Sequence, residues 1–511
     1  MSEVEIRITE KELPSPKPPP ENGNGHPDND GNIPQDYQLG HITTDVGNAE
    51  RFVRQYGEVV KYNSKRKMWL IWQGTHWDWD DNVRILSLAQ KTARSIYSEA
   101  AIQEDPRYRR VLSDWAQSSE SNVHLKAIVE QVKPRVVIEL NELDQNGWLY
   151  NCANGTIDLR TGQLLAHRKE DLITVCVPIT YDSTAQCSKW LTFLDYITDH
   201  NIELQTYLQK TVGYTLTAEV KEQIFFDCYG ELGNNGKTTF LTIVRSLVGD
   251  YGTPVPIDLF LHNTKSNAAQ GHTESLANIQ GKRFIIPSEL ERRARLAMGL
   301  LKTLTGNDAI KASRKGEHEI DFVPVCKIWI YGNYKPIVNE TGNSFWRRLK
   351  LIPFNVTVPA EKIDKNLPAD LQKELSGILN WAIEGCLAWQ KEGFGKCDAV
   401  TDATQKYREE SDELALFIVD SCEIGIGKDY FATKKAMKDA YSQWCEDNGR
   451  YPMRASDFGH SLTGKGILDG KQGNQRGWLG IKITYSVYGK EDKADKKGSS
   501  ENETPDDEPN Y

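Results

Sequence analysis

Hydrophobic and polar positions follow two different periods in the first part of the chain. Residues 45–53 carry apolar side chains at helical spacing, and so do residues 84–133 and 190–216. Residues 68–80 (MWLIWQGTHWDWD) alternate around a glycine turn, which is typical of a β-hairpin, and the spacing of their four tryptophans favours a place in the core over stacking on nucleic-acid bases. Residues 148–182 combine β-forming side chains with glycine turns and predict small strands.

Beyond residue 222 the pattern changes to apolar strands that alternate with helices. The predicted strands and the helix between the first two occupy residues 223–230, 237–249, 283–289 and 326–333. Such alternation indicates an α/β layer. Two long helices are expected at 371–391 and 401–421, and a small helix–helix–helix–hairpin unit at about 412–487.

The two ends of the chain differ in composition from the rest. Residues 1–40 hold seven of the 21 prolines, with eight acidic and three basic residues, and residues 491–511 also hold eight acidic and three basic residues. Such segments bury too little apolar surface to fold, so we expect disordered tails at 1–40 and 488–511. Residues 1–40 and 491–511 together carry the whole net charge of −10 of the 511-residue chain. Overall acidity therefore does not exclude a local nucleic-acid-binding surface.

Membrane and zinc-ribbon classes find no support in the sequence. No apolar run approaches the roughly 18 residues of a membrane span, and the start lacks the apolar stretch of a signal peptide. The nine cysteines are dispersed without a C-x-x-C pair, which suits thiols in a reducing cytosol.

A glycine-rich loop follows the strand at 223–230 and ends in Gly236-Lys237-Thr238 before a helix. Phosphate binding needs this arrangement, because backbone N–H groups surround the β-phosphate, the lysine reaches the β/γ oxygens and the threonine hydroxyl holds Mg²⁺. The predicted ATP contacts are Gly230, Gly233, Asn234, Asn235, Gly236, Lys237, Thr238 and Thr239. The usual spacing would place a glycine at position 231, which is Glu231, so either Gly230 or Gly233 makes the turn. We expect the Lys237 side chain to be exposed, so that its loss leaves the fold intact.

Two later strands end in polar residues suited to ATP hydrolysis. Glu289 follows the strand RFIIPS and is predicted to polarise the attacking water and to help hold Mg²⁺ through a water molecule, with Glu291 as the other carboxylate nearby. Asn333 ends the strand KIWIYG and is predicted to orient the water against the γ-phosphate. Each residue taken alone also fits an ordinary polar residue after a strand.

Two arginines follow in the segment FWRRLKLIPF. Arg347 or Arg348 is predicted to reach the γ-phosphate of a neighbouring subunit as an arginine finger. The alternative is a basic strand edge that forms ordinary salt bridges.

Two further segments carry candidate DNA contacts. Residues 301–322 predict a helix end, a strand, a turn and a returning strand, with basic side chains near the turn. The candidate phosphate contacts there are Lys302, Arg314, Lys315 and His318. A solvated turn is the other interpretation.

The unit at about 412–487 suggests a winged helix. Ser456 is predicted to N-cap its third helix, residues 471–476 to form the wing tip with Arg476 on DNA, and residues 478–483 to form the return strand. A protein-docking module fits the same pattern.

Taken in order, these segments resemble the superfamily 3 helicase domain of phage and plasmid primase-helicases, which is related to the poxvirus primase-helicase. The resemblance covers about residues 45–486. It rests on these segments: TDVGNAERF, GTHWDWD, WLYNCANGTIDLRTG, GNNGKTTF, RFIIPSELE, LKTLTGNDAIKASRK, YGNYKPIV and FWRRLKLIPF. The chain departs from the family pattern in its longer loop and in Gly332, where a hydroxyl residue is common.

The resemblance implies an AAA+-like P-loop ATPase core of the α/β class, preceded by a small α+β domain and followed by a winged-helix domain. It implies a homo-oligomeric ring, expected to be a hexamer, that binds ATP and Mg²⁺ between subunits and moves along single-stranded and forked DNA, with the hairpin near residue 315 as the translocating element. It also implies a cytoplasmic protein of a phage, prophage or plasmid in a bacterial host. The predicted domains are 41–190 (pre-helicase), 191–395 (ATPase) and 400–487 (winged helix).

The function expected from the sequence is ATP-dependent DNA unwinding during replication. No primase module is expected before the helicase part, because residues 1–40 are too short for one. Two alternatives stay open: the helicase subunit of a primase-helicase whose primase is a separate protein, and a DNA-binding initiator or packaging ATPase that does not unwind.

Overall fold

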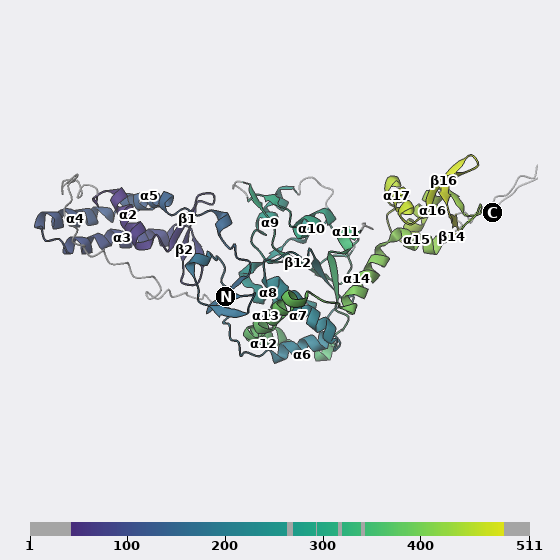
Figure 1. Ribbon diagram of the computed structural model, residues 1–511, viewed down its shortest axis with the longest axis horizontal. Helices are drawn as coiled ribbons and strands as arrows, with labels where there is room; N and C mark the ends of the chain where they lie inside the picture. Colours follow the sequence, from purple (N-terminus) through teal and green to yellow (C-terminus); the bar gives the residue numbers. More distant parts are fainter. Residues whose placement is uncertain (1–41, 263–268, 293, 315–318, 339–342, 485–511) are drawn as a thin grey trace, which may run out of the picture. The chain divides into compact units, whose positions relative to one another are not determined.

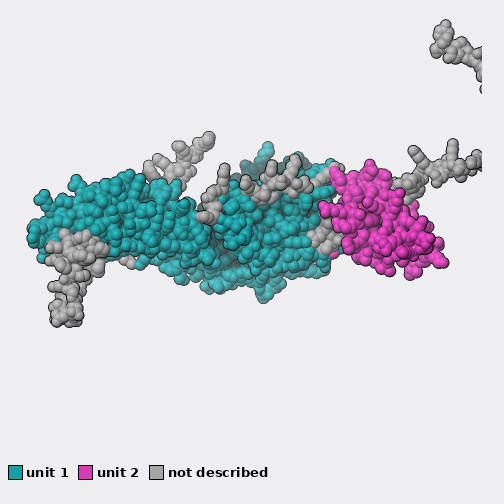
Figure 2. All heavy atoms as spheres, turned by 90° about the horizontal axis from the view of Figure 1, so that it is seen from above, with its two compact units in different colours: residues 1–405 teal, residues 406–511 magenta. Residues whose placement is uncertain are grey.

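The computed structural model describes residues 42–262, 269–292, 294–314, 319–338 and 343–484. The chain divides into two compact units, residues 1–405 and 406–511, which Figure 2 colours separately. The tails predicted at 1–40 and 488–511 lie outside the described residues. Within the described part, no helix is both long and apolar enough to cross a membrane.

Unit 1 begins with helices packed on a small antiparallel sheet. The predicted helix opens at Asp45 because the Thr44 hydroxyl accepts a hydrogen bond from an N–H of its first turn at 3.0 Å. The aromatic hairpin forms with Trp72 opposite Trp77, and the Trp69 and Trp77 side chains are buried, so the core interpretation holds for them. The elements are α2 (Asp45–Tyr56), β1 (Val60–Asn63), β2 (Met68–Trp72), β3 (Trp77–Asp80), α3 (Val83–Ala101), α4 (Pro106–Ser119) and α5 (Asn122–Val132).

A second three-stranded sheet leads to the main core. It consists of β4 (Leu149–Cys152), β5 (Gly155–Asp158) and β6 (Gln163–Leu165). The buried Arg283 guanidinium donates to the Leu149 carbonyl of this sheet at 2.8 Å and to the Leu216 carbonyl, at the end of a core helix, at 2.6 Å. One arginine thus ties the small sheet to the main core of the unit.

The centre of unit 1 is a five-stranded parallel sheet. In spatial order its strands are β13 (Leu349–Pro353), β7 (Phe225–Tyr229), β12 (Lys327–Gly332), β9 (Phe284–Pro287) and β8 (Gly252–Val255). β7 comes first in the chain but lies between the last two strands. In open parallel sheets, ligands bind beyond the carboxyl ends of the strands at such a change in strand order. The loop after β7 therefore occupies the position that this topology favours for a ligand.

Helices lie on both faces of this sheet (Figure 1). On one face are α6 (Ser188–Ile197), α7 (Ile202–Leu216), α8 (Lys237–Val248), α12 (Leu367–Lys373) and α13 (Leu375–Glu392). On the other are α9 (Ala269–Ala277), α10 (Met298–Thr305) and α11 (Asn343–Trp346). Phe226 of β7 and Phe240 of α8 contact the central Trp329, with ring centroids 4.5 and 6.0 Å away. These aromatic contacts hold α8 against the sheet.

Glycines set the distance between α7 and α13. A Cβ atom at Gly213 would lie 2.1 Å from the backbone nitrogen of Cys386, and one at Gly385 would lie 2.1 Å from the Gln209 carbonyl oxygen. The two backbones therefore approach more closely than any larger side chain would permit.

Unit 2 is a small helix-and-sheet body with its own core. Its elements are α15 (Glu413–Ser421), β14 (Cys422–Ile424), β15 (Phe431–Thr433), α16 (Lys434–Asp447), α17 (Ala455–Gly464), β16 (Leu468–Gln472), β17 (Gln475–Leu479) and β18 (Ile481–Ile483). The core is built on aromatic side chains, with Tyr441 stacked on Phe458 at 4.7 Å between ring centroids.

Three local predictions about the C-terminal region were wrong. The helix expected at 401–421 breaks at Asp412, because the Asp412 carboxylate accepts a hydrogen bond from Ala415 N–H and caps a new helix, α15, after α14 (Asp398–Ser411). Ser456 does not cap α17, which begins one residue earlier. The strand expected at 478–483 divides into β17 and β18 at Gly480, where φ is +86°.

Candidate nucleotide-binding site

The loop between β7 and α8 is shaped by two glycines. A Cβ atom at Gly230 would lie 2.4 Å from the Phe354 carbonyl oxygen, and one at Gly236 would lie 2.6 Å from the Ile197 side chain. Gly236 also has φ of +81°, where side chains are strained. A Cβ atom at Gly233 would meet nothing within 4 Å. Of the two glycines that the sequence left open for the turn, Gly230 is the one that the packing requires.

Lys237 is the first residue of α8, and its ammonium group is held by three oxygens. Nζ donates to the Asn333 side-chain oxygen at 2.8 Å, to that of Asn235 at 2.9 Å and to the Gly230 carbonyl at 3.0 Å. The residue is only 4% exposed, so the expectation of an exposed lysine was wrong. Burial lowers the pKa of the ammonium group, although the carboxylate of Glu289 opposes the shift.

Hydrogen bonds also connect Lys237, through Asn333, to Glu289 at the end of another strand. Asn333 follows β12, and its side-chain nitrogen donates to Glu289 Oε1 at 3.0 Å; Glu289 follows β9. The sequence-predicted residues Lys237, Asn333 and Glu289 thus form one hydrogen-bonded chain along the carboxyl edge of three parallel strands. Between the two carboxylates, the structure joins Glu289 rather than Glu291 to this chain.

Two threonines follow Lys237 in the first turn of α8. Thr238 is exposed and Thr239 half-buried, beside the exposed Asn234 and the buried Asn235. No group of three or more His, Cys, Asp or Glu residues that would enclose a metal occurs in the described part of the chain. An exposed hydroxyl and the exposed Glu289 carboxylate nevertheless suit Mg²⁺, which prefers a few protein oxygens together with phosphate and water.

Asp227 is a charged residue of the site that the sequence analysis missed. It lies in β7, is 2% exposed, and burial raises the pKa of its carboxyl to about 7, although Lys335 and Lys237 oppose the shift. Lys335 lies over the Tyr229 ring at 5.0 Å from the centroid. An acidic residue inside the apolar run QIFFDCYG was the available signal.

A cavity of about 400 Å³ opens beside the loop. Two segments wall it: residues 197–204 at the turn between α6 and α7, and residues 353–356 after β13; Ala399 of α14 completes it. Both segments reach the loop, because Ile197 approaches Gly236 and the Phe354 carbonyl oxygen approaches Gly230. Sequence reasoning did not find this cavity, because its walls come from segments about 150–200 residues apart in the chain.

The turn that lines the cavity has an unusual backbone. Asp199 and His200 have φ of 53° and 60°, two successive left-handed residues that are not glycine. Such backbone strain is concentrated at functional sites in proteins. The exposed Asp199 and Asn355 place a carboxylate and an amide at the cavity.

The structure separates the two candidate arginines. Arg348 is 9% exposed and donates to the Ser344 carbonyl at 2.6 Å inside its own chain. Arg347 is exposed and donates to the Gln223 side chain at 3.0 Å, just before the amino end of β7. Lys237 lies beyond the carboxyl end of β7. The length of this strand, at roughly 3.3 Å per residue, therefore separates Arg347 from Lys237 within one chain. Of the two arginines, Arg347 is the one available to a neighbouring subunit.

The candidate DNA contacts lie on three elements. The hairpin predicted near residue 315 is present as β10 (Ile310–Ala312) paired with β11 (Ile320–Phe322). Arg314 donates to the Ala277 carbonyl at 3.1 Å, at the end of α9, and Lys302 is half-buried in the last turn of α10. Lys315 and His318 lie outside the described residues. In unit 2, Arg476 is exposed on β17 opposite Lys471 of β16.

Two known families match separate parts of unit 1. A family described as "D5 N terminal like" matches residues 49–199, and a "Family of unknown function (DUF5906)" matches residues 228–348. A protein of Acanthamoeba polyphaga mimivirus named "Putative helicase L207/L206" is 24% identical over 437 residues, covering 76% of this chain and 44% of the relative. The "Putative primase C962R" of African swine fever virus (strain Badajoz 1971 Vero-adapted) is 21% identical over 337 residues, covering 60% of this chain and 34% of the relative.

The chain is similar to viral proteins named putative helicases and primases, and part of it matches the D5 N terminal like family. A further viral relative, "Putative helicase 184R" of Invertebrate iridescent virus 6, is 26% identical over 259 residues, covering 48% of this chain and 26% of the relative. The chain thus spans less than half the length of each of these three relatives. Among solved structures, the apo C-terminal region of NrS-1 is similar with a TM-score of 0.41 at 9% identity, covering 82% of this chain and 95% of that one.

Proposed function

We propose that this chain is the ATP-hydrolysing motor of a replicative DNA helicase, with an AAA+-like P-loop core of the superfamily 3 type in unit 1 and a winged helix in unit 2. The observation that carries the proposal is the hydrogen-bonded chain Lys237–Asn333–Glu289 at the carboxyl edge of the parallel sheet. It places a cation, an amide and a carboxylate beyond three strands at the point where the strand order changes. The names of the relatives, helicase and primase, point in the same direction.

In this proposal the β7–α8 loop holds the phosphates of ATP. The backbone N–H groups before Lys237 and the start of α8 surround the β-phosphate. Lys237 exchanges its Asn333 contact for a γ-phosphate oxygen, since both are oxygen acceptors of one ammonium group. That exchange frees Asn333 to orient the attacking water.

In this proposal Glu289 accepts a proton from the attacking water. Its carboxylate accepts a hydrogen bond from Asn333, and in this proposal it polarises the attacking water of the bound ATP. Thr238 and, through water, Glu289 would hold Mg²⁺. The ion supplies charge neutralisation for the phosphate oxygens when it is bound.

The 400 Å³ cavity beside the loop takes the nucleoside end of ATP. Its Ile197 and Val356 walls are apolar and suit a base, and its Asp199 carboxylate suits the ribose hydroxyls. The contact between Ile197 and Gly236 keeps base and phosphates at a fixed separation.

Assembly into a ring, expected to be a hexamer, completes the site. Arg347 then reaches the γ-phosphate bound by the next subunit, where it stabilises the charge that develops in the transition state. The β10–β11 hairpin and the wing of unit 2 supply the DNA contacts.

A forked-duplex strand-displacement assay tests the proposal. The wild-type chain with ATP and Mg²⁺ should separate the strands, Lys237→Ala should not, and Lys391→Ala, which removes an exposed lysine of α13, should behave like the wild type. ATP hydrolysis without any strand separation would favour the initiator alternative. Ribonucleotide primer synthesis by an added primase only in the presence of this chain would favour the primase-helicase subunit, an alternative supported by the relatives named primase.

A further inference from the structure

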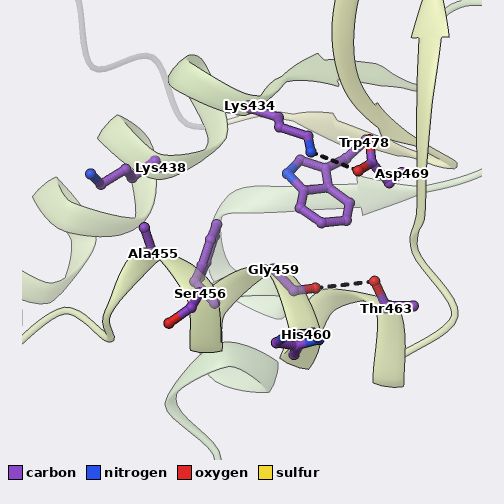
Figure 3. A pocket seen from close by; sticks show the side chains of 10 residues that line it. Lys434, Lys438, Ala455, Ser456, Gly459, His460, Thr463, Asp469 and Trp478 are labelled. Atoms are coloured by element: carbon purple, nitrogen blue, oxygen red, sulfur yellow. Dashed lines mark hydrogen bonds and ion pairs between the residues drawn. The ribbon is translucent and has the colours of Figure 1, made fainter.

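A second cleft lies in unit 2, away from the nucleotide site. It has a volume of about 350 Å³ and lies between α16, α17 and the β16–β17 hairpin (Figure 3). Phe458, Gly459 and Trp478 form its apolar side. The polar side chains around it are Lys434, Lys438, Ser456, His460, Thr463 and Asp469.

One ion pair crosses the rim of this cleft. Lys434 Nζ donates to Asp469 Oδ2 at 2.6 Å beside the Trp478 ring, as Figure 3 shows, and the two charged side chains are 45% and 52% exposed. An ion pair this exposed contributes little to stability, about 0–1 kcal/mol. Lys434 therefore exchanges its partner at low cost when another anion arrives.

The charges of unit 2 are segregated around the cleft. The first half of α16 (434–440) and residues 454–465 and 468–479, which surround it, carry seven basic and three acidic residues. These are Lys434, Lys435, Lys438, Arg454, Lys465, Lys471 and Arg476 against Asp439, Asp457 and Asp469. The remaining described residues of the unit, from 406 to 484, carry five basic and nine acidic residues. A neutral body with one basic face is suited to a polyanion that lies along that face.

We propose that this cleft binds the sugar–phosphate backbone of duplex DNA. On binding, Lys434 exchanges its contact with the Asp469 carboxylate for a contact with a phosphate oxygen. Lys434 and Lys438 stand one helical turn apart on α16, so both ammonium groups reach the same stretch of backbone. The exposed Ser456 hydroxyl, in the first turn of α17, lies on the opposite wall and donates to Asp457 Oδ1 at 3.0 Å. Lys471 and Arg476, paired on the wing, extend the basic face beyond the cleft.

Asp469 is then a competitor for Lys434 and restrains DNA binding. The inference takes its partner from the proposed role in DNA replication, but it does not depend on ATP hydrolysis. Removing the carboxylate leaves the lysine free for phosphate, so loss of an exposed acidic side chain should strengthen binding.

The experiment measures fluorescence anisotropy of a labelled duplex with the full-length chain, without nucleotide, over a series of salt concentrations. Lys434→Gln and Lys438→Gln should each weaken binding about threefold to tenfold and reduce the log–log salt slope by about 0.9. Asp469→Asn should tighten binding about threefold or more, by the same charge argument. The matched control is Lys482→Gln, which removes an exposed lysine of β18 outside the cleft.

Three results would overturn the inference. The first is duplex binding by both lysine variants that equals that of Lys482→Gln, with unchanged thermal unfolding midpoints. The second is an Asp469→Asn variant that binds no more tightly than the wild type. The third is displacement of DNA by polyglutamate at equal charge concentration, which would identify a general docking surface for acidic proteins. Because nucleotide is absent, none of these results depends on whether the chain hydrolyses ATP.

Discussion

Two lysines of the molecule, Lys237 and Lys434, each begin a helix and each contact oxygen acceptors, but their surroundings differ. Lys237 is 4% exposed and contacts three oxygens from the loop and from a neighbouring strand end. Lys434 has a side chain 45% exposed and pairs with one carboxylate. A buried cation with fixed partners has one geometry, whereas an exposed cation contributes charge with little restriction on position. We therefore expect chemistry at Lys237 and salt-dependent docking at Lys434.

The largest effect is expected from Lys237→Ala. Loss of the ammonium group should abolish ATP hydrolysis, because a donor aimed at developing charge is removed from a prearranged site. Steady-state phosphate release measures this, beside Lys391→Ala. Since Lys237 is buried and not exposed, thermal unfolding must be recorded as well. Near-normal turnover in a folded variant would show that ATP is not hydrolysed at this edge of the sheet.

Arg347→Ala should reduce hydrolysis by about a thousandfold if the guanidinium acts across subunits. Rings mixed from Arg347→Ala and Lys237→Ala chains should regain part of the activity, because some interfaces then combine two intact halves. Mixed rings that form but stay inactive at every ratio would exclude a finger in trans.

A smaller effect is expected at the cavity beside the loop. Ala399→Phe would project a ring into the space proposed for the nucleoside and should raise the KM for ATP about tenfold with little change in kcat. Thr401→Phe, an exposed residue of the same helix, is the control. Equal KM values for the two variants would mean that the base lies elsewhere.

The last prediction concerns stability rather than turnover, at Asp227. Its pKa rises from 3.8 to about 7 in the folded chain, so between these values the folded state holds a proton that the unfolded state releases. The contribution of this carboxyl to stability is therefore fully present below about pH 4 and falls by up to about 4 kcal/mol as the pH rises from there to about 7. Urea unfolding of the wild type and of Asp227→Asn across that range checks this. A difference between the two proteins that does not change with pH would show that the carboxyl titrates normally.

Much of the nucleotide site could be predicted because parallel strands bring their carboxyl ends together. Lys237, Glu289 and Asn333 each follow a strand in the sequence, and the structure joins them by hydrogen bonds. What the sequence could not resolve depends on packing. The need for Gly230 comes from the Phe354 carbonyl more than 120 residues away, and the burial of Arg348 but not Arg347 depends on how α11 packs on the sheet.

The C-terminal predictions show the same limit at short range. A helix expected to run from 401 to 421 has no breaking glycine or proline, yet the Asp412 side chain ends one helix and begins the next. Whether a side chain of this kind caps a helix or faces solvent depends on neighbours, here Lys465, which pairs with Asp412 at 2.5 Å.

The most direct test of the nucleotide-site assignment compares Glu289→Gln with Glu291→Gln in one measurement of ATP binding and hydrolysis. The hydrogen bond from Asn333 joins Glu289 to Lys237, and on this ground we propose Glu289 as the residue next to the attacking water. We predict that Glu289→Gln binds ATP with wild-type affinity but hydrolyses it at least about a hundredfold more slowly, while Glu291→Gln hydrolyses it normally. Normal hydrolysis by Glu289→Gln, with or without loss of activity in Glu291→Gln, would contradict the assignment of the Lys237–Asn333–Glu289 chain to catalysis.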